Sequence, residues 1–305
     1  MDKPLPKWML FACLLTFGFL WGCTVPAQKI AVETGHHPIG MIFWQLVIAV
    51  VLLTPVALIR GSKLVLDARH LRFFLFVALC GTIVPNSFSL IASFHLPGGV
   101  MALAIATVPV FSLMFAVLLR IEQIQARRLL GVLCGAVAVS LLIVPEASLP
   151  DPSKWLFVFV ALIAPIAYGL EGNYLALSNP PATGPVATLL GASILGALIC
   201  VPLVVALGAF INPVEIGMGR SEWALFASSA LHVAAYLGYI WLVSRAGPVF
   251  TSQVAYIVTP AGVVLSAIVL GETHSPWLWA SLAIMLLALT LVQPRRKKVA
   301  EAVAV

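Results

Sequence analysis

The stretch GVMALAIATVPVFSLMFAVLL at residues 99–119 contains no charged side chain. The hydrocarbon core of a bilayer is about 30 Å thick, and a helix of about 20 apolar residues crosses it. An uninterrupted apolar run of this length is therefore typical of a transmembrane helix and not of a soluble core. This stretch indicates a helical membrane protein, and similar runs elsewhere in the chain indicate how many helices it has.

Apolar runs of comparable length recur along the whole sequence, separated by short polar breaks or by breaks that contain Pro and Gly. They lie at residues 8–27, 39–59, 71–92, 99–119, 128–145, 153–173, 184–207, 222–242, 250–270 and 276–293. The chain is 62% hydrophobic and 9% charged, whereas soluble proteins carry about 25% charged residues. We predict an all-α integral membrane protein with ten transmembrane helices and no soluble domain.

The basic residues are distributed unequally over the breaks between these runs. With the N-terminus in the cytoplasm, 14 of the 17 Lys and Arg lie on the cytoplasmic side, and only Lys29, Lys154 and Arg220 lie opposite. Basic residues in short loops resist translocation, so this asymmetry predicts that both termini are cytoplasmic. The net charge of +6 is then a topology signal, with Arg295–Lys298 ending the last helix. We expect a multi-pass protein of the cell (plasma or inner) membrane and no nucleic-acid partner.

The chain repeats itself with an offset of 151 residues. Two prolines spaced 12 apart, followed by an apolar run that ends in an acid, occur twice: Pro97, Pro109 and Glu122, then Pro248, Pro260 and Glu272. This pattern predicts two halves of five helices each, at residues 1–146 and 151–305. Because five is odd, the halves would insert with opposite topology. Inverted repeats of this kind recur in secondary transporters, whose substrate site lies near the midplane between the repeats.

These residues resemble the drug/metabolite transporter superfamily, and within it the ten-helix family built from two EamA-type repeats. The resemblance is carried by WGCTVPAQK at residues 21–29, by the two proline segments, and by the endings LRIE at 119–122 and LGE at 270–272. LRIE departs from the family pattern, since it lacks the usual glycine before the acid and has one extra residue. The resemblance implies a transporter of amino acids, other metabolites or drugs, and it does not identify the substrate.

Residues 230–240 read ALHVAAYLGYI and place titratable side chains in the middle of an apolar run. At 100° per residue, His232, Tyr236 and Tyr239 share one face of a helix. Unpaired polar groups in hydrocarbon cost several kcal/mol, so this face should point into the bundle. We predict that it forms a cavity wall, where His232 meets the solute or carries a coupling proton. In the alternative interpretation, the imidazole is hydrogen-bonded to a neighbouring helix purely for packing.

Other side chains are candidates for the same cavity because they are polar or aromatic and lie inside apolar runs. They are Asn86, Gln253, Tyr256, Trp21, Tyr168 and Glu171, and Pro85, Pro109 and Pro260 are predicted helix kinks. Trp21 and Tyr168 would otherwise be packing or interface anchors. Glu171 would otherwise be solvated at the membrane surface. Gly81 occupies the repeat position that matches His232.

We therefore expect a secondary-active transporter that exports small organic metabolites, such as amino acids or similar amphipathic solutes, by alternating access. Its partners would be a small-molecule solute and the lipid bilayer, and it would be a monomer or a homodimer. A drug or nucleotide-sugar transporter and a non-transport membrane enzyme remain alternatives. The sequence contains neither a GxxxxGK[ST] nor an HExxH motif, so we do not expect an enzyme. The five cysteines lack CxxC spacing, and no metal or cofactor is expected.

Overall fold

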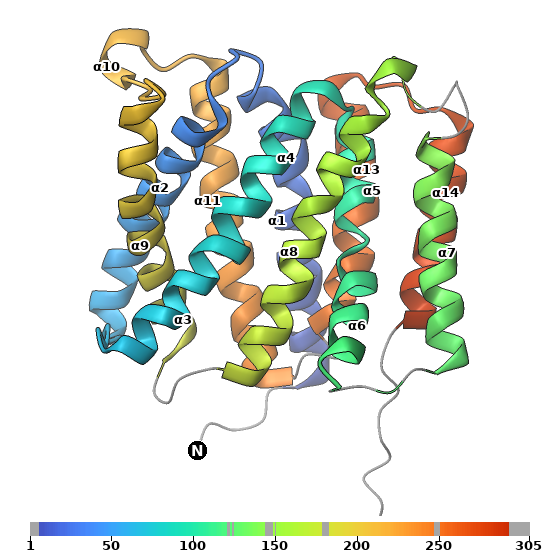
Figure 1. Cartoon of the computed structure of the whole chain (residues 1–305), viewed down its shortest axis with the longest axis horizontal. Helices are drawn as coiled ribbons and strands as arrows, with labels where there is room; N and C mark the ends of the chain where they lie inside the picture. The colour runs from blue at the N-terminus through green and yellow to red at the C-terminus, as the bar shows by residue number, and fades with distance from the viewer. Residues whose placement is uncertain are drawn as a thin grey trace, which may run out of the picture.

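The computed structural model describes residues 6–120, 123, 125–143, 149, 151–178, 183–246 and 251–292. Glu122, Pro248 and the cluster Arg295–Lys298, which figured in the repeat and in the topology prediction, lie outside the described residues. Within these ranges the regular structure is helical. The helices stand side by side as an upright bundle (Figure 1).

Each predicted apolar run coincides with one helix or with a series of consecutive helices. The elements are α1 (Lys7–Ala31), α2 (Pro38–Arg60), α3 (Ala68–Ala78), η1 (Leu79–Ile83), α4 (Val84–His95), α5 (Gly98–Ile105), α6 (Val108–Leu118), α7 (Ala126–Ile143), η2 (Pro152–Lys154), α8 (Leu156–Ser178), α9 (Pro185–Ala206), α10 (Pro213–Ile216), α11 (Arg220–Ala246), η3 (Ser252–Val254), α13 (Ala255–Leu270) and α14 (Pro276–Val292). Here η1 is a π-helical turn, whereas η2 and η3 are 3₁₀ turns.

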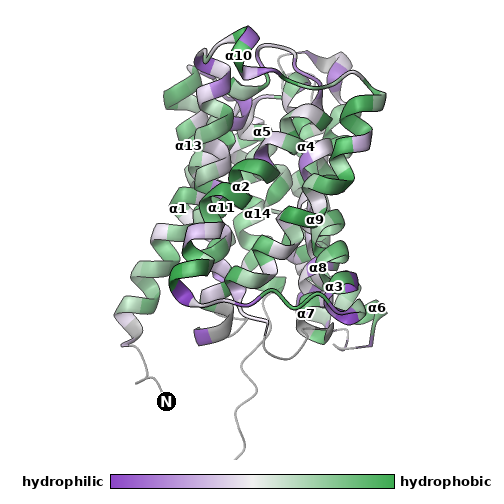
Figure 2. Cartoon of the chain, turned by 90° about the vertical axis from the view of Figure 1, so that its left-hand side faces the viewer, coloured by the Kyte–Doolittle hydropathy of each residue, from purple (hydrophilic) through white to green (hydrophobic). Residues whose placement is uncertain are grey.

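In the described part of the chain, seven helical stretches are long and apolar enough to cross a membrane. The helices α13 and α14 are apolar but have only 16 and 17 residues, which at 1.5 Å per residue reach about 25 Å. Figure 2 shows hydrophobic residues along the sides of the bundle and hydrophilic ones gathered at its two ends. The protein is therefore a multi-pass helical membrane protein. The count of ten spans remains a prediction.

The three proline segments differ in how the helix accommodates the ring. A proline lacks the backbone N–H and clashes with the carbonyl four residues earlier. Pro85 lies in the first turn of α4, directly after the wide π-helical turn η1. Pro109 lies in the first turn of α6, after a turn at Ala106 and Thr107 that interrupts the run. Pro260 lies inside α13, which continues through it without a break.

The main packing partners come from opposite halves of the sequence. The helix α1 packs against α11 and α13, and α8 packs against α4 and α6. Three further pairs are α2 with α9, α7 with α14, and α5 with α13. Each pair joins an element that precedes residue 146 with one that follows residue 151, so the two sequence halves interleave throughout the bundle.

Glycines permit the closest of these approaches. A Cβ atom added to Gly22 of α1 would lie 2.7 Å from the Cβ atom of Ala261 in α13. At Gly131 of α7 it would lie 2.8 Å from a methyl group of Val292 in α14. Small residues let membrane helices come close enough for van der Waals packing to hold them together. Gly22 and Gly131 therefore permit close helix contacts within the chain.

Candidate functional site

A cavity of about 400 Å³ lies between the helices that pair across the two halves. Its wall is contributed by α1, α4, α5, α6, α7, α8, α11, α13 and α14. Pockets for small organic molecules span about 300–1,000 Å³ and combine an apolar lining with a few placed polar groups. This cavity has both properties, since aliphatic side chains alternate with the aromatic and polar residues described below.

One side of the cavity is a group of aromatic rings from α1 and α11. The indole of Trp21 lies 5.8 Å from the His232 ring, 6.0 Å from Tyr236 and 5.7 Å from Tyr239, measured between centroids. The Trp21 and His232 planes are nearly perpendicular, at 89°. Edge-to-face pairs at this separation contribute about 0.5–1.5 kcal/mol each beyond burial. The polar stripe of α11 therefore faces α1 and the cavity.

The contacts of the α11 side chains differ. Tyr236 is 4% exposed, and its hydroxyl donates a hydrogen bond to Oε1 of Glu171 on α8. His232 contacts Trp21 and Tyr236 through its ring. Among the described residues, no side chain or backbone group forms a hydrogen bond with the His232 imidazole. The hydrogen bond from Tyr236 connects the second half's helices α11 and α8 directly across the cavity wall.

Glu171 is an acid almost without solvent contact, at 3% exposure. Removing a carboxylate from water costs several kcal/mol unless hydrogen bonds or a cation compensate. The Tyr236 hydroxyl supplies one such hydrogen bond. Opposite it, Gly81 in η1 leaves the space for the carboxyl group, because a Cβ atom there would lie 2.6 Å from Glu171 Cδ. The acid is thus held between a tyrosine donor and a glycine.

A second polar group is a chain of three side chains from three helices. The Tyr168 hydroxyl on α8 donates to Oδ1 of Asn86 on α4, at 3.1 Å. The amide nitrogen of Asn86 then donates to Oε1 of Gln45 on α2, at 3.3 Å. Buried amides are costly without partners, and here both ends of the Asn86 amide are used. The chain links α2, α4 and α8.

The structure brings most of the predicted cavity residues together. Those that line the cavity are His232, Tyr236, Tyr239, Asn86, Tyr256, Trp21, Tyr168 and Glu171, together with the predicted kink residue Pro109. Gln253, Pro85 and Pro260 are not part of this lining. Gln253 belongs to the 3₁₀ turn η3, so the direction of its side chain differs from that in a regular α-helix.

Arg128 is the main lining residue that the sequence argument missed. It was counted with the loop cations, but it lies in the first turn of α7, is 4% exposed and lines the cavity. A signal was available: Gly131 and Gly135 follow it at i+3 and i+7, on the face that packs inward. Gln45, which holds the Asn86 amide, gave no comparable signal.

A polytopic helical bundle with a polar cavity between its two halves has the form of a membrane transporter. Comparison with known proteins supports this class. Residues 6–144 match the model of the EamA-like transporter family. The "Uncharacterized inner membrane transporter YedA" of Escherichia coli K12 is 26% identical over 291 residues, which cover 93% of this chain and 90% of that protein. The same protein from Escherichia coli O157:H7 matches equally.

The chain also shares its fold with a solved structure titled "Crystal structure of protein". The TM-score is 0.52 at 16% sequence identity, with 94% of this chain and 96% of the other covered. The predicted resemblance to EamA-type transporters is thus confirmed. Over residues 6–144 the chain matches the EamA-like transporter family, and over 93% of its length it is similar to an inner membrane transporter.

Proposed function

We propose that the protein is a secondary-active exporter of small organic metabolites, such as amino acids or similar amphipathic solutes, working by alternating access. The observation that carries this proposal is the cavity of about 400 Å³ with one buried acid and a group of aromatic rings. Rings stack on apolar parts of a solute, and the acid pairs with an amine. No ATP-binding motif is present in the sequence, so an ion gradient or the solute's own gradient supplies the energy.

We further propose that the chain is built from ten membrane-spanning segments in two inverted repeats, 1–146 and 151–305. The packing pattern supports this. In the repeat, α1 corresponds to α8, α3 and α4 to α11, and α5 and α6 to α13. If each helix is replaced by its counterpart in the other half, the pair α1–α11 becomes α8–α4, and the pair α1–α13 becomes α8–α6. All four pairs are in contact in the structure. A twofold relation between the halves would produce this pattern.

We place both termini in the cytoplasm and the protein in the inner membrane. Lys29 and Lys154 line one pocket, and Arg220 pairs with Glu33 just beyond α1, at 3.8 Å. The three cations assigned to the non-cytoplasmic side therefore lie at one end of the bundle. The helices α2, α6 and α11 finish at the other end (Figure 1), where most of the remaining basic residues follow in sequence. The relative's printed name supports the inner membrane.

The test is untargeted mass spectrometry of the medium from cells that overproduce the wild type or Glu171→Gln. The amide keeps the shape and accepts the Tyr236 hydrogen bond, but it cannot pair with a cation as a carboxylate does. We expect a metabolite that the wild type enriches, with at least about a tenfold lower export rate for the variant, as for loss of a buried charge contact of about 1.4 kcal/mol or more.

The matched control is Phe159→Leu on the same helix, whose side chain is half exposed on the outer surface of the bundle. It should export at the wild-type rate. Accumulation of the same metabolite inside the cells would contradict export. Equal export by Glu171→Gln and the wild type would remove the acid from the mechanism.

A further inference from the structure

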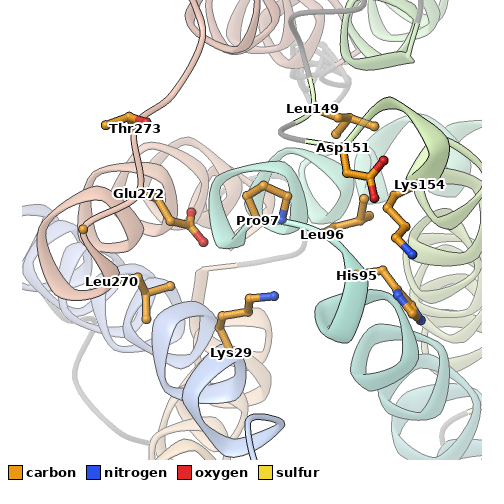
Figure 3. A pocket seen from close by; sticks show the side chains of 11 residues that line it. Lys29, His95, Leu96, Pro97, Leu149, Asp151, Lys154, Leu270, Glu272 and Thr273 are labelled. Atoms are coloured by element: carbon orange, nitrogen blue, oxygen red, sulfur yellow. The ribbon is translucent and has the colours of Figure 1, made fainter.

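A second pocket lies at the end of the bundle where α1 finishes and α5 begins, and it is separate from the central cavity. This vestibule has a volume of about 420 Å³. It is lined by Lys29, His95, Leu96, Pro97, Leu149, Asp151, Lys154, Leu270, Gly271, Glu272 and Thr273 (Figure 3). Four charged side chains, two of each sign, thus gather around one hollow.

The two acids of the vestibule are engaged by nearby donors. The carboxylate of Glu272 accepts hydrogen bonds from the backbone N–H groups of Gly98, at 2.8 Å, and Gly99, at 3.2 Å, where α5 begins. Asp151 accepts from the backbone N–H of Ser153 at 3.0 Å and from its hydroxyl at 2.7 Å. The hydrogen bonds from Ser153 also lower the pKa of the Asp151 carboxyl. Both acids are therefore turned toward these donors.

The two lysines are less constrained. Lys29 donates one hydrogen bond from Nζ to the carbonyl oxygen of Ser93, at 2.5 Å, which leaves two of its three protons for other acceptors. Lys154 lies within electrostatic range of Asp151, but it forms no hydrogen bond and no ion pair within 4 Å with the part of the chain that the structure describes. The His95 ring lies within electrostatic range of both ammonium groups and stacks on Phe157, with the centroids 3.6 Å apart.

The vestibule and the central cavity share two walls. On α1, Gln28 lines the cavity while the next residue, Lys29, lines the vestibule. On α4, Ser93 lines the cavity, and its carbonyl holds the Lys29 ammonium. A group bound to Lys29 in the vestibule is therefore about one layer of side chains away from the cavity.

We propose that the vestibule is a second binding site, in which Lys29 and Lys154 hold the carboxylate of a small soluble organic anion. Two ammonium groups on different elements act as point charges that suit one compact anion, and charge-assisted hydrogen bonds to a carboxylate are about twice as strong as neutral ones. The site goes beyond the proposed function, because it requires neither export nor a role for Glu171.

The test measures the charge of the vestibule by thiol chemistry. The five native cysteines are replaced by serine or alanine, and His95→Cys introduces one thiol within electrostatic range of both lysines. In phosphatidylcholine nanodiscs, its rates of reaction with an anionic and with a cationic methanethiosulfonate are compared. We expect the anionic reagent to be favoured relative to a Val214→Cys control at the same end, where Val214 is 90% exposed. Adding Lys154→Gln should lower the ratio about tenfold, a typical effect of focused charge on association rates.

The ligand class is tested on the same thiol with acetate, phosphate and methylammonium at millimolar concentration. Acetate should slow the modification severalfold, methylammonium should not, and Lys154→Gln should abolish the protection. Thr273→Cys, at an exposed lining position, is a second reporter if His95→Cys is not monodisperse.

Three results would overturn the proposal. They are a rate ratio equal to that of the Val214→Cys control, acetate protection that survives Lys154→Gln, and protection that appears only with phosphate or with anionic lipid in the nanodisc, which would assign the lysines to a phosphate group. Since no transport is measured, a failure of the export assay leaves this test unaffected.

Discussion

Two helix pairs build the walls of the central cavity with different side chains. The pair α1–α11 contributes Trp21, His232 and two tyrosines, whereas the pair α4–α8 contributes an amide, a tyrosine and the buried Glu171. Gly81 in η1, just before α4, occupies the position that corresponds to His232 in α11. At the α11 position, the His232 imidazole projects into the cavity. At the matching position in η1, Gly81 has no side chain and leaves space for the Glu171 carboxyl group. The acid therefore depends on a glycine as much as on its hydrogen-bond donor.

Gly81→Ala should break this comparison most severely. A methyl group at this position meets the Glu171 carboxyl group, and overpacking of this kind costs about 1–3 kcal/mol. We expect a lower free energy of unfolding in detergent and loss of export, because the acid is displaced from Tyr236. The control for the stability measurement is Gly172→Ala on α8, where the added methyl meets no described atom within 4 Å apart from its own helix backbone and the helix propensity of alanine favours the variant. Equal stability of the two variants would contradict this reading of Gly81.

Tyr236→Phe should have a smaller effect, because it removes one hydrogen bond and keeps the ring contacts. Hydrogen bonds between membrane helices average roughly 0.6 kcal/mol and reach about 1.7 kcal/mol, so we expect a cost of about 1 kcal/mol in thermal unfolding. Export should fall severalfold, since Glu171 loses its donor. Tyr239→Phe is the matched variant on the same stripe, and it should retain both stability and export. If Tyr236→Phe and Tyr239→Phe have the same thermal stability and the same export rate, the hydrogen bond to Glu171 does not distinguish the two tyrosines.

Asp67→Ala should have the smallest effect and should leave export unchanged. Asp67 lies outside the cavity and caps α3, where its carboxylate accepts hydrogen bonds from the backbone N–H and the imidazole of His70, both at 2.8 Å. These two bonds hold the pKa of the carboxyl below its usual range. The stabilisation is therefore present at neutral pH and is lost as the pH falls through the lowered pKa. The wild type should lose its small Tm advantage over the variant in acid, and a constant difference would contradict this.

The sequence predicted the helical class and much of the cavity lining for a simple reason. Length and hydropathy define membrane helices one at a time, and the periodicity of α11 shows which face of a single helix carries His232 and both tyrosines. Contacts between helices are another matter. Gln45 accepts the Asn86 hydrogen bond from a different helix, and no pattern within α2 marks it. Arg128 was misplaced because a cation at the edge of an apolar run was counted as a loop residue.

Gln253 and the prolines illustrate a second limit. Gln253 was expected in an α-helix but lies in the 3₁₀ turn η3, and Pro85 was predicted to kink its helix, where the structure has the π-helical turn η1 directly before it. Local winding of this kind depends on what the neighbouring helices require. The π turn before Pro85 avoids the clash with the ring, and it also brings Gly81 to Glu171. A sequence pattern that assumes one constant rotation per residue does not contain this information.

The π-helical turn also has a consequence for how this span tolerates insertions and deletions. A π turn contains one more residue than the α-helical turn it replaces. Deleting one residue from Leu79–Ile83 would remove the wide turn without rotating α3 relative to Asn86, because an α-helical turn completes the same rotation with one residue fewer. Each residue of α3 would then keep its face toward α9, and the cost would fall on the Pro85 ring and on the contact between Gly81 and Glu171. The same deletion elsewhere in α3 would rotate the residues before it by about 100°, so a length change should be felt along the helix everywhere except at this turn.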